Sequence, residues 1–315
     1  GHEAVATALL DHGADVAVAA NNGKTALMFS AQGGHEAVAK ALLDHGADVA
    51  AADKDGATAL MASAEGGHDE VTQLLLHNGA NVAAAANNGQ TALIYAAVGG
   101  SDAVTKVLLD HGANVAAANN DGNTALMVAA QGGHEAVAKV LLDNGSNVAA
   151  AAKNGVTALM ASADGGHEAV ATALLDHGAD VAVAANNGKT ALMFSAQGGH
   201  EAVAKALLDH GADVAAADKD GATALMASAE GGHDEVTQLL LHNGANVAAA
   251  ANNGQTALIY AAVGGSEAVT KALLDHGADV AAANKDGTTA LMVAAHCGHE
   301  AVTKALLDHG ADVAA

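Results

Sequence analysis

Apolar residues recur along this chain in two alternating groups, and each group has the spacing of a short helix. Residues three and four positions apart lie on one face of a helix, so each group predicts a helix with one buried stripe. In residues 21–53 the two groups are Ala26, Leu27, Met28 and Ala31, followed by Val38, Ala41, Leu42 and Leu43. The pattern therefore predicts two short helices in each stretch of this kind.

The residues that flank the first apolar group predict where its helix begins and ends. Thr25 precedes the group, and its hydroxyl can accept a hydrogen bond from a free backbone N–H of the first turn. Gly33 and Gly34 follow the group and interrupt the helical pattern. The second helix is expected to begin near His35 and Glu36.

The connection between one helix pair and the next is marked by glycine and small polar residues. Gly46 is expected to end the second helix, because glycine readily adopts the left-handed conformation that follows a helix. Val49 is expected to anchor an extended stretch. Tight turns are expected at residues 21–23 and 54–56, which read Asn-Asn-Gly and Lys-Asp-Gly.

The two-helix pattern repeats every 33 residues without an insertion. A half repeat occupies residues 1–20, and nine repeats follow from residue 21 to residue 315. A longer period of 165 residues divides the chain into super-repeats 1–165 and 166–315, and residues 1–101 are identical to residues 166–266. Because one repeat cannot bury its own apolar face, neighbouring repeats must stack. We therefore expect a single solenoid domain over residues 1–315.

The repeats resemble ankyrin repeats, which share this length and the pattern DG-x-TPLH-x-AA-x-x-GH-x-x-V-x-x-LL-x-x-GAD-V. The match extends over the whole chain. The resemblance implies an all-α repeat solenoid of stacked helix-turn-helix units with hairpin-like loops, protein binding on the concave side and no catalysis. The chain departs from the family pattern at Ala26, Met28 and Ala50, where the family has Pro, His and Asn. These departures predict loops that are held less rigidly.

The net charge of the chain restricts the classes of partner that it is expected to bind. The formal net charge is -23, and every basic residue is a lysine. Nucleic-acid binding needs a basic surface that displaces counterions from phosphate, and this chain has none. No apolar run approaches the length of a membrane span. We expect a protein partner or self-association, with no nucleic acid, no membrane insertion and no cofactor.

The resemblance places the binding surface on the turns and on the exposed end of each first helix. The candidate binding residues in these slots are Lys24, Gln32, Asp55, Ala57, Glu65, Gln90, Val98, Asn123, Lys189 and Gln255. Binding hot spots favour Trp, Tyr and Arg. The chain has no Trp and no Arg, and these slots hold no clear Tyr. A tight and specific partner is therefore not evident from the sequence.

One slot of the first helix holds every aromatic residue of the chain: Phe29, Tyr95, Phe194 and Tyr260. By analogy with the family, we expect this slot to pack between neighbouring helices. A binding hot spot is the alternative interpretation.

Histidines are the most frequent residues with potential chemistry, and most of the 18 fall at the start or the end of a second helix. We expect them to bond backbone groups, and a distributed response to pH is the alternative. His296, Cys297 and His299 form the one local cluster of zinc-ligand types. Zinc usually takes four protein ligands in a structural site, and only three are near here. The cluster is better explained by sequence variation than by metal binding.

These observations favour a non-enzymatic scaffold that mediates protein–protein interaction. The alternative is a self-assembling structural protein that forms a filament or another extended array. The near-identical super-repeats favour this alternative, because a lattice uses equivalent contacts. An enzymatic or metal-binding role is the third and least supported interpretation.

Overall fold

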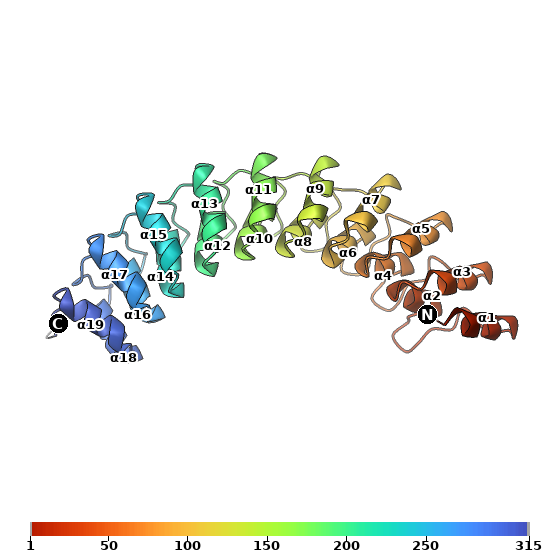
Figure 1. The fold of residues 1–315 in the computed structure, drawn as a ribbon, viewed down its shortest axis with the longest axis horizontal. Helices are drawn as coiled ribbons and strands as arrows, with labels where there is room; N and C mark the ends of the chain where they lie inside the picture. Colours follow the sequence, from red (N-terminus) through yellow and green to blue (C-terminus); the bar gives the residue numbers. More distant parts are fainter. Residues whose placement is uncertain (1, 314–315) are drawn as a thin grey trace. The chain divides into compact units, whose positions relative to one another are not determined.

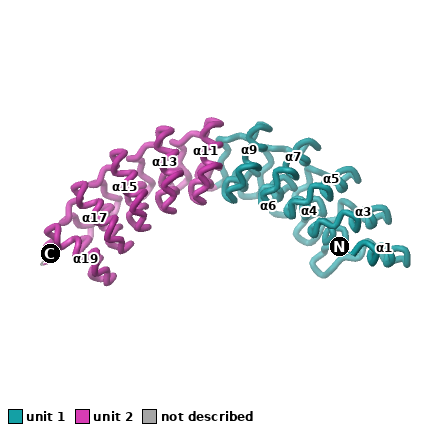
Figure 2. Tube along the Cα trace, viewed as in Figure 1, with its two compact units in different colours: residues 1–153 teal, residues 154–315 magenta. Residues whose placement is uncertain are grey.

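The computed structural model describes residues 2–313, and in this range every regular element is a helix apart from isolated β-bridges in the turns. Two compact units divide the chain, residues 1–153 and residues 154–315 (Figure 2). The predicted all-α repeat solenoid is confirmed as the fold class, with the predicted pair of helices in each complete repeat.

Unit 1 contains the described helices from α1 to α9. Their bounds are α1 (Glu3–Asp11), α2 (Ala26–Gln32), α3 (Glu36–Asp44), α4 (Ala59–Glu65), α5 (Asp69–His77), α6 (Ala92–Gly99), α7 (Asp102–Asp110), α8 (Ala125–Gln131) and α9 (Glu135–Asp143). Within this unit, the first helices of successive repeats pack side by side from α2 to α8, and the second helices do the same from α1 to α9 (Figure 1). The two rows form two layers.

Unit 2 repeats this arrangement in the described residues from 154 onward. Its helices are α10 (Ala158–Asp164), α11 (Glu168–Asp176), α12 (Ala191–Gly198), α13 (Glu201–Asp209), α14 (Ala224–Gly231), α15 (Asp234–His242), α16 (Ala257–Gly264), α17 (Glu267–Asp275), α18 (Ala290–Cys297) and α19 (Glu300–Asp308). First helices again contact first helices, and second helices contact second helices.

The core of each unit lies between these two layers and is made of small and medium apolar side chains. Leu27 and Leu60 of the first helices, and Leu75 and Leu108 of the second helices, are almost fully buried. The burial of these leucines follows the predicted helical stripes. In α3, however, the buried residues are Ala39 and Leu42, whereas Val38, Ala41 and Leu43 of the predicted stripe are only half-buried. The stability of each repeat therefore depends on the repeats next to it.

The first helices begin as predicted, at a threonine cap. The hydroxyl oxygen of Thr25 accepts a hydrogen bond from the backbone N–H of Met28 at 3.4 Å. The equivalent hydroxyls of Thr190 and Thr256 are buried and have no hydrogen-bond partner in the described structure. The cap is thus a feature of most repeats rather than of all.

The turns are held by aspartate or asparagine side chains and by the neighbouring turn. The Asp53 carboxylate accepts hydrogen bonds from the backbone N–H groups of Asp55 and Ala57, both at 2.9 Å. The Lys54 N–H donates to the Asn22 carbonyl of the preceding turn at 3.1 Å. The hairpin-like loops are therefore ordered by local and inter-repeat bonds.

The prediction that Val49 anchors an extended stretch is wrong. Val49 lies in a turn, where the Asp48 carboxylate accepts from the Ala50 N–H at 2.8 Å and the Asp48 carbonyl accepts from the Ala51 N–H at 3.3 Å. A short acidic side chain that bonds its own backbone favours a turn over a strand. Within residues 2–313, extended pairing is confined to single bridges such as Ala52 with Thr58.

Histidines at the start of the second helices join one repeat to the preceding one. His68 is the N-cap residue of α5, but its side chain makes no capping hydrogen bond, and its Nε2 bonds the Gln32 carbonyl at 3.0 Å instead. Its ring lies against Gly34, where an added Cβ would come within 2.5 Å of the ring and where φ is +68°. This contact, here called the histidine clasp, recurs in unit 2 where His233 bonds the Gln197 carbonyl at 3.0 Å.

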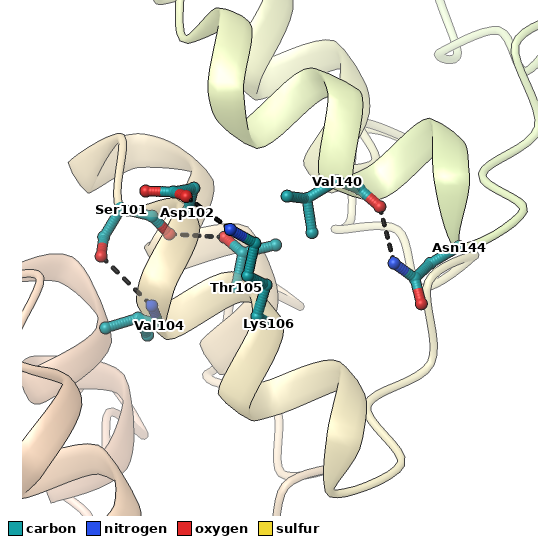
Figure 3. Close-up of polar contacts among 7 residues, drawn as sticks. All are labelled: Ser101, Asp102, Val104, Thr105, Lys106, Val140 and Asn144. Carbon is teal, nitrogen blue, oxygen red and sulfur yellow. Dashed lines mark hydrogen bonds and ion pairs between the residues drawn. The ribbon is translucent and has the colours of Figure 1, made fainter.

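Serine replaces the clasp histidine at position 101 and acts differently. The Ser101 hydroxyl accepts from the Val104 N–H at 3.2 Å and so caps its own helix, while the Lys106 ammonium pairs with Asp102 at 2.8 Å (Figure 3). Asn144 donates to the Val140 carbonyl at 2.8 Å in the same view. Ser101 thus makes a bond within its own helix instead of one to the preceding repeat. Asn144 takes the place of a helix-end histidine and keeps the same kind of bond, to the carbonyl four residues earlier, that His45 makes to Ala41.

Candidate functional site

We call the exposed residues of the turns and the first helices the turn face. Five of the predicted binding residues meet there in one pocket of about 220 Å³, together with Tyr95. These five are Lys24, Gln32, Asp55, Ala57 and Glu65. The pocket, here called the Tyr95 pocket, lies within unit 1, and its lining residues come from three consecutive repeats.

Unit 2 contains the corresponding Tyr260 pocket, with a volume of about 230 Å³. Its lining includes Lys189, a predicted residue, and the acidic residues Asp220 and Glu230 at the places of Asp55 and Glu65. The two pockets are equivalent because the residues that form them lie in the identical segments 1–101 and 166–266. Each unit thus has one copy of the same site.

The other predicted residues lie outside these two pockets. The Gln90 and Gln255 side chains accept hydrogen bonds from Asn88 and Asn253, at 3.0 Å and 2.8 Å, and so belong to their own turns. Asn123 is partly exposed in its turn. Val98 is an exposed apolar residue near the end of α6, 44 % accessible.

The expectation that the aromatic slot packs in the core is wrong for Phe29, which is 51 % exposed, and incomplete for both tyrosines, which are partly exposed and line the pockets. Both tyrosines thus belong to the turn face, where the sequence showed no clear tyrosine. The sequence contained a signal that this slot is not fully buried. Ala62 and Val128 occupy the same slot in other repeats, and a fully buried position would not exchange alanine for tyrosine without a large cavity or overpacking.

The Tyr95 pocket is electrostatically negative. Burial raises the pKa of the Tyr95 hydroxyl, the charge of Glu65 raises it further, a hydrogen bond with Asn88 lowers it, and Asp53 and Asp55 add smaller increases. Tyr260 has the same shift from the same kinds of neighbour. Both phenols are therefore neutral hydrogen-bonding groups at physiological pH.

Lysine contributes one positive charge to each pocket. The Lys24 ammonium donates to the Gln32 side chain at 3.3 Å, and Lys189 donates to Gln197 at 2.9 Å. Lys189 also lies over the ring of Phe194, with its Nζ 5.9 Å from the ring centroid. A cation within about 6 Å of an aromatic face is attracted by the ring quadrupole.

Histidines at the ends of the second helices bond the backbone, as expected. The His45 Nδ1 lies 2.8 Å from the Ala41 carbonyl, four residues earlier, and similar bonds recur along the chain. His77 and His111 lie edge to face with ring centroids 5.9 Å apart. These contacts are on the second helices and away from the pocket residues.

The structure does not bring a metal site together in the described residues. No group of three or more His, Cys, Asp or Glu side chains there is placed to hold a metal ion. His296 and Cys297 end α18, Cys297 is exposed, and His299 bonds the Val263 carbonyl at 3.2 Å. Over the same described range, every helix is too short or too polar to cross a bilayer.

Paired helices in two layers, with turns and first helices forming an exposed polar surface, define a helical repeat protein. The chain belongs to the ankyrin-repeat family, because the family model for three-copy ankyrin repeats matches residues 1–86, 82–152, 116–185, 147–218, 182–251 and 247–315. Ankyrin repeats generally mediate protein–protein interaction, and the family is typically non-enzymatic.

A solved structure supports the same assignment. The crystal structure of the human ASB11 ankyrin repeat domain is similar to this chain, with a TM-score of 0.64 and 26% sequence identity. The similarity covers 71% of this chain and 99% of that domain. A search of curated protein sequences gives no match.

Proposed function

We propose that this protein is a non-enzymatic scaffold that binds segments of other proteins on its turn face. The observation that carries the proposal is the pair of equivalent pockets in which a partly exposed tyrosine meets charged side chains. Tyrosine is enriched at binding hot spots because it combines a large apolar ring with a polar tip. The family's general role in protein–protein interaction supports this use of the surface.

The location of binding can be tested without a known partner. Peptides are selected from a random displayed library on the folded protein, and their affinities are then measured for two double variants. Val98→Arg with Val263→Arg alters the turn face at exposed residues outside the two pockets. Gln73→Arg with Gln238→Arg adds the same charge to exposed positions on second helices.

We expect the turn-face variant to weaken binding by roughly tenfold or more, because an unpaired charge at an interface is costly to desolvate. The second-helix variant should retain the affinity. The reverse order of effects would place the binding surface on the second helices and contradict the proposal.

Self-association is a second candidate function, and one observation favours it. An apolar hollow of about 530 Å³ lies against α1, α2 and α3, and its lining includes Leu9, Val16, Phe29 and Val38. Leu9 and Phe29 are 58 % and 51 % exposed. Large exposed apolar patches mark interaction sites. A contact between unlike surfaces of two copies that does not close on itself gives an open array.

Sedimentation velocity over a concentration series tests this candidate. We expect the chain to associate as its concentration rises, and Leu9→Glu with Phe29→Glu to reduce this association. A wild-type chain that remains monomeric at high concentration would rule out assembly through the hollow, and would leave the scaffold function as the only proposal.

A further inference from the structure

The two tyrosine pockets are too small for most organic ligands but suited to one side chain. Their volumes are about 220 Å³ and 230 Å³, whereas pockets for small molecules usually measure about 300–1,000 Å³. Met28, Met61 and Ala62 supply apolar walls to the Tyr95 pocket, and Asp55 and Glu65 supply charge. A long side chain with an apolar stem and a charged tip matches this lining.

The chain itself contains an example of a cation on the same aromatic slot. Lys189 precedes Phe194 by five residues, and its ammonium lies 5.9 Å from the centre of the Phe194 ring. The residue five positions before Tyr95 is Gln90, and the residue five positions before Tyr260 is Gln255. Neither Tyr95 nor Tyr260 therefore has a lysine five residues earlier in the chain, as Phe194 has.

The acidic residues around each tyrosine differ in whether their carboxylates accept hydrogen bonds from the chain itself. The Asp53 carboxylate stabilises its own turn, since it accepts hydrogen bonds from the backbone N–H groups of Asp55 and Ala57. Asp55 and Glu65 are exposed, and in the described part of the chain neither side chain has an ion pair or a hydrogen bond. Both carboxylates are therefore available to a cation from outside.

We propose that the Tyr95 and Tyr260 pockets each bind the lysine or arginine side chain of a basic protein segment. The stem lies against the exposed part of the tyrosine ring, above the nearly buried methionine side chains of the pocket floor. The charged tip pairs with Asp55 and Glu65, or with Asp220 and Glu230. Charge complementarity favours this occupant over a neutral or acidic segment, because each lining contains three carboxylates and one lysine and the whole chain carries a formal charge of -23. This proposal rests on the proposed protein-binding function and names its partner chemistry.

The two tyrosines are the reporters for the test, because the chain contains two Tyr and no Trp. The probe is a decapeptide of alternating lysine and glycine, blocked at both ends, and its acidic counterpart alternates glutamate and glycine. Intrinsic tyrosine fluorescence is followed during each titration and is repeated at higher salt. Tyr260→Leu leaves Tyr95 as the single reporter, and Tyr95→Leu leaves Tyr260.

We expect the lysine peptide to change the fluorescence of each tyrosine saturably, and the acidic peptide to leave both unchanged. Calorimetry should show that Tyr95→Leu with Tyr260→Leu weakens binding of the lysine peptide by about three- to tenfold, the usual value of a cation–aromatic contact. These two substitutions leave the net charge unchanged, so general attraction cannot account for the loss.

A matched pair of charge variants separates the pocket from the general negative field. Glu65→Gln with Glu230→Gln removes two charges from the pockets, and Glu70→Gln with Glu235→Gln removes two from exposed positions on α5 and α15. We expect the pocket variant to lose affinity severalfold more than the helix variant. Circular dichroism confirms that each variant is folded.

Equal losses in the two charge variants, or unchanged tyrosine fluorescence while the peptide binds, would overturn the pocket proposal. No binding of the lysine peptide at all would overturn it as well. In each of these cases the proposed scaffold function would stand if selected peptides still lost affinity in the Val98→Arg and Val263→Arg variant.

Discussion

Each tyrosine of this protein lies beside carboxylates of the preceding repeat, and this predicts how it titrates. Burial and the charge of Glu65 raise the pKa of Tyr95 above its ordinary value of 10.0. The absorbance change of phenolate formation should therefore have its midpoint above that of free tyrosine, and Glu65→Gln with Glu230→Gln should lower the midpoint. A midpoint at or below that of free tyrosine would show that the pockets are not negative.

The same shift predicts the sign of a stability change in alkali. The folded-state pKa is raised, so the unfolded chain loses its phenol proton first as pH increases. The contribution of each tyrosine to stability is complete below about pH 10 and is lost as pH rises through the higher folded-state value. Urea unfolding at pH 9 and at pH 11 should show this loss to be smaller in Glu65→Gln with Glu230→Gln.

The histidine clasp predicts an unequal effect of two glycine substitutions. Gly34 and Gly46 both have positive φ, +68° and +84°, but an added Cβ at Gly34 would meet the His68 ring while nothing lies within 4 Å at Gly46. Gly46→Ala should cost about 1 kcal/mol of unfolding free energy from the backbone alone, and Gly34→Ala should cost more. Equal urea midpoints for the two variants would show that the clasp contributes no close packing.

At the scale of single residues, the sequence predicted local structural roles better than it predicted contacts between residues of different repeats. The threonine caps and the helix-end histidines follow from local spacing. The clasp of His68 onto Gln32 spans 36 residues, and the pocket around Tyr95 collects residues from three repeats. Such contacts depend on how repeats stack, which a single repeat does not contain.

The stacking of helices in rows predicts that a core substitution destabilises the neighbouring repeats more than the distant ones. Leu108 on α7 is fully buried, and Leu108→Ala should cost about 2–5 kcal/mol through lost burial and a cavity. Hydrogen exchange should accelerate in α5, α7 and α9, because coupling in a stacked repeat protein acts mainly between neighbours. Leu307→Ala, at a residue that is 39 % exposed, is the control and should cost much less.

Acceleration of hydrogen exchange spread evenly over α1 to α9 after Leu108→Ala would contradict nearest-neighbour coupling.

The helices themselves were predictable, because their apolar stripes and the glycines that end them are strong local signals. The turn at Val49 was not, because the hydrogen bond that the Ala50 N–H donates to the Asp48 carboxylate favours a turn over an extended backbone. The aromatic slot was expected in the core by analogy with the family. The analogy does not say how much of a large side chain in this slot stays exposed, and Phe29 is 51 % exposed.

For the whole molecule, charge predicts a response to pH. The formal charge is -23 with histidine neutral, and protonation of all 18 histidines would leave -5. Histidine in general changes charge between about pH 5 and 8, and lower net charge weakens self-repulsion. We expect more association near pH 5.5 than at pH 8 in low salt, with a smaller difference in high salt. Equal sedimentation at both pH values in low salt would exclude this effect.

The duplication of 165 residues gives the molecule two equal pockets, one in each compact unit. The sequence predicted this equivalence, since residues 1–101 and 166–266 are identical. The expectation taken from the family overlooked the tyrosine on this repeated surface, although Ala62 and Val128 in the same slot were a signal for it. The repeat length and the glycine positions recur in every complete repeat, whereas the few residues that vary between repeats give the turn face its two tyrosine pockets.

The central claim is that this protein binds other proteins through its turn face, and hydrogen exchange of the complex tests it most directly. A peptide selected on the folded protein is added to saturation, and amide exchange is compared with that of the free protein. The account predicts slower exchange in the turns around residues 53–58 and 218–223 and in α4 and α14, with the second helices α5 and α15 unchanged. Protection confined to α5 and α15 would contradict it.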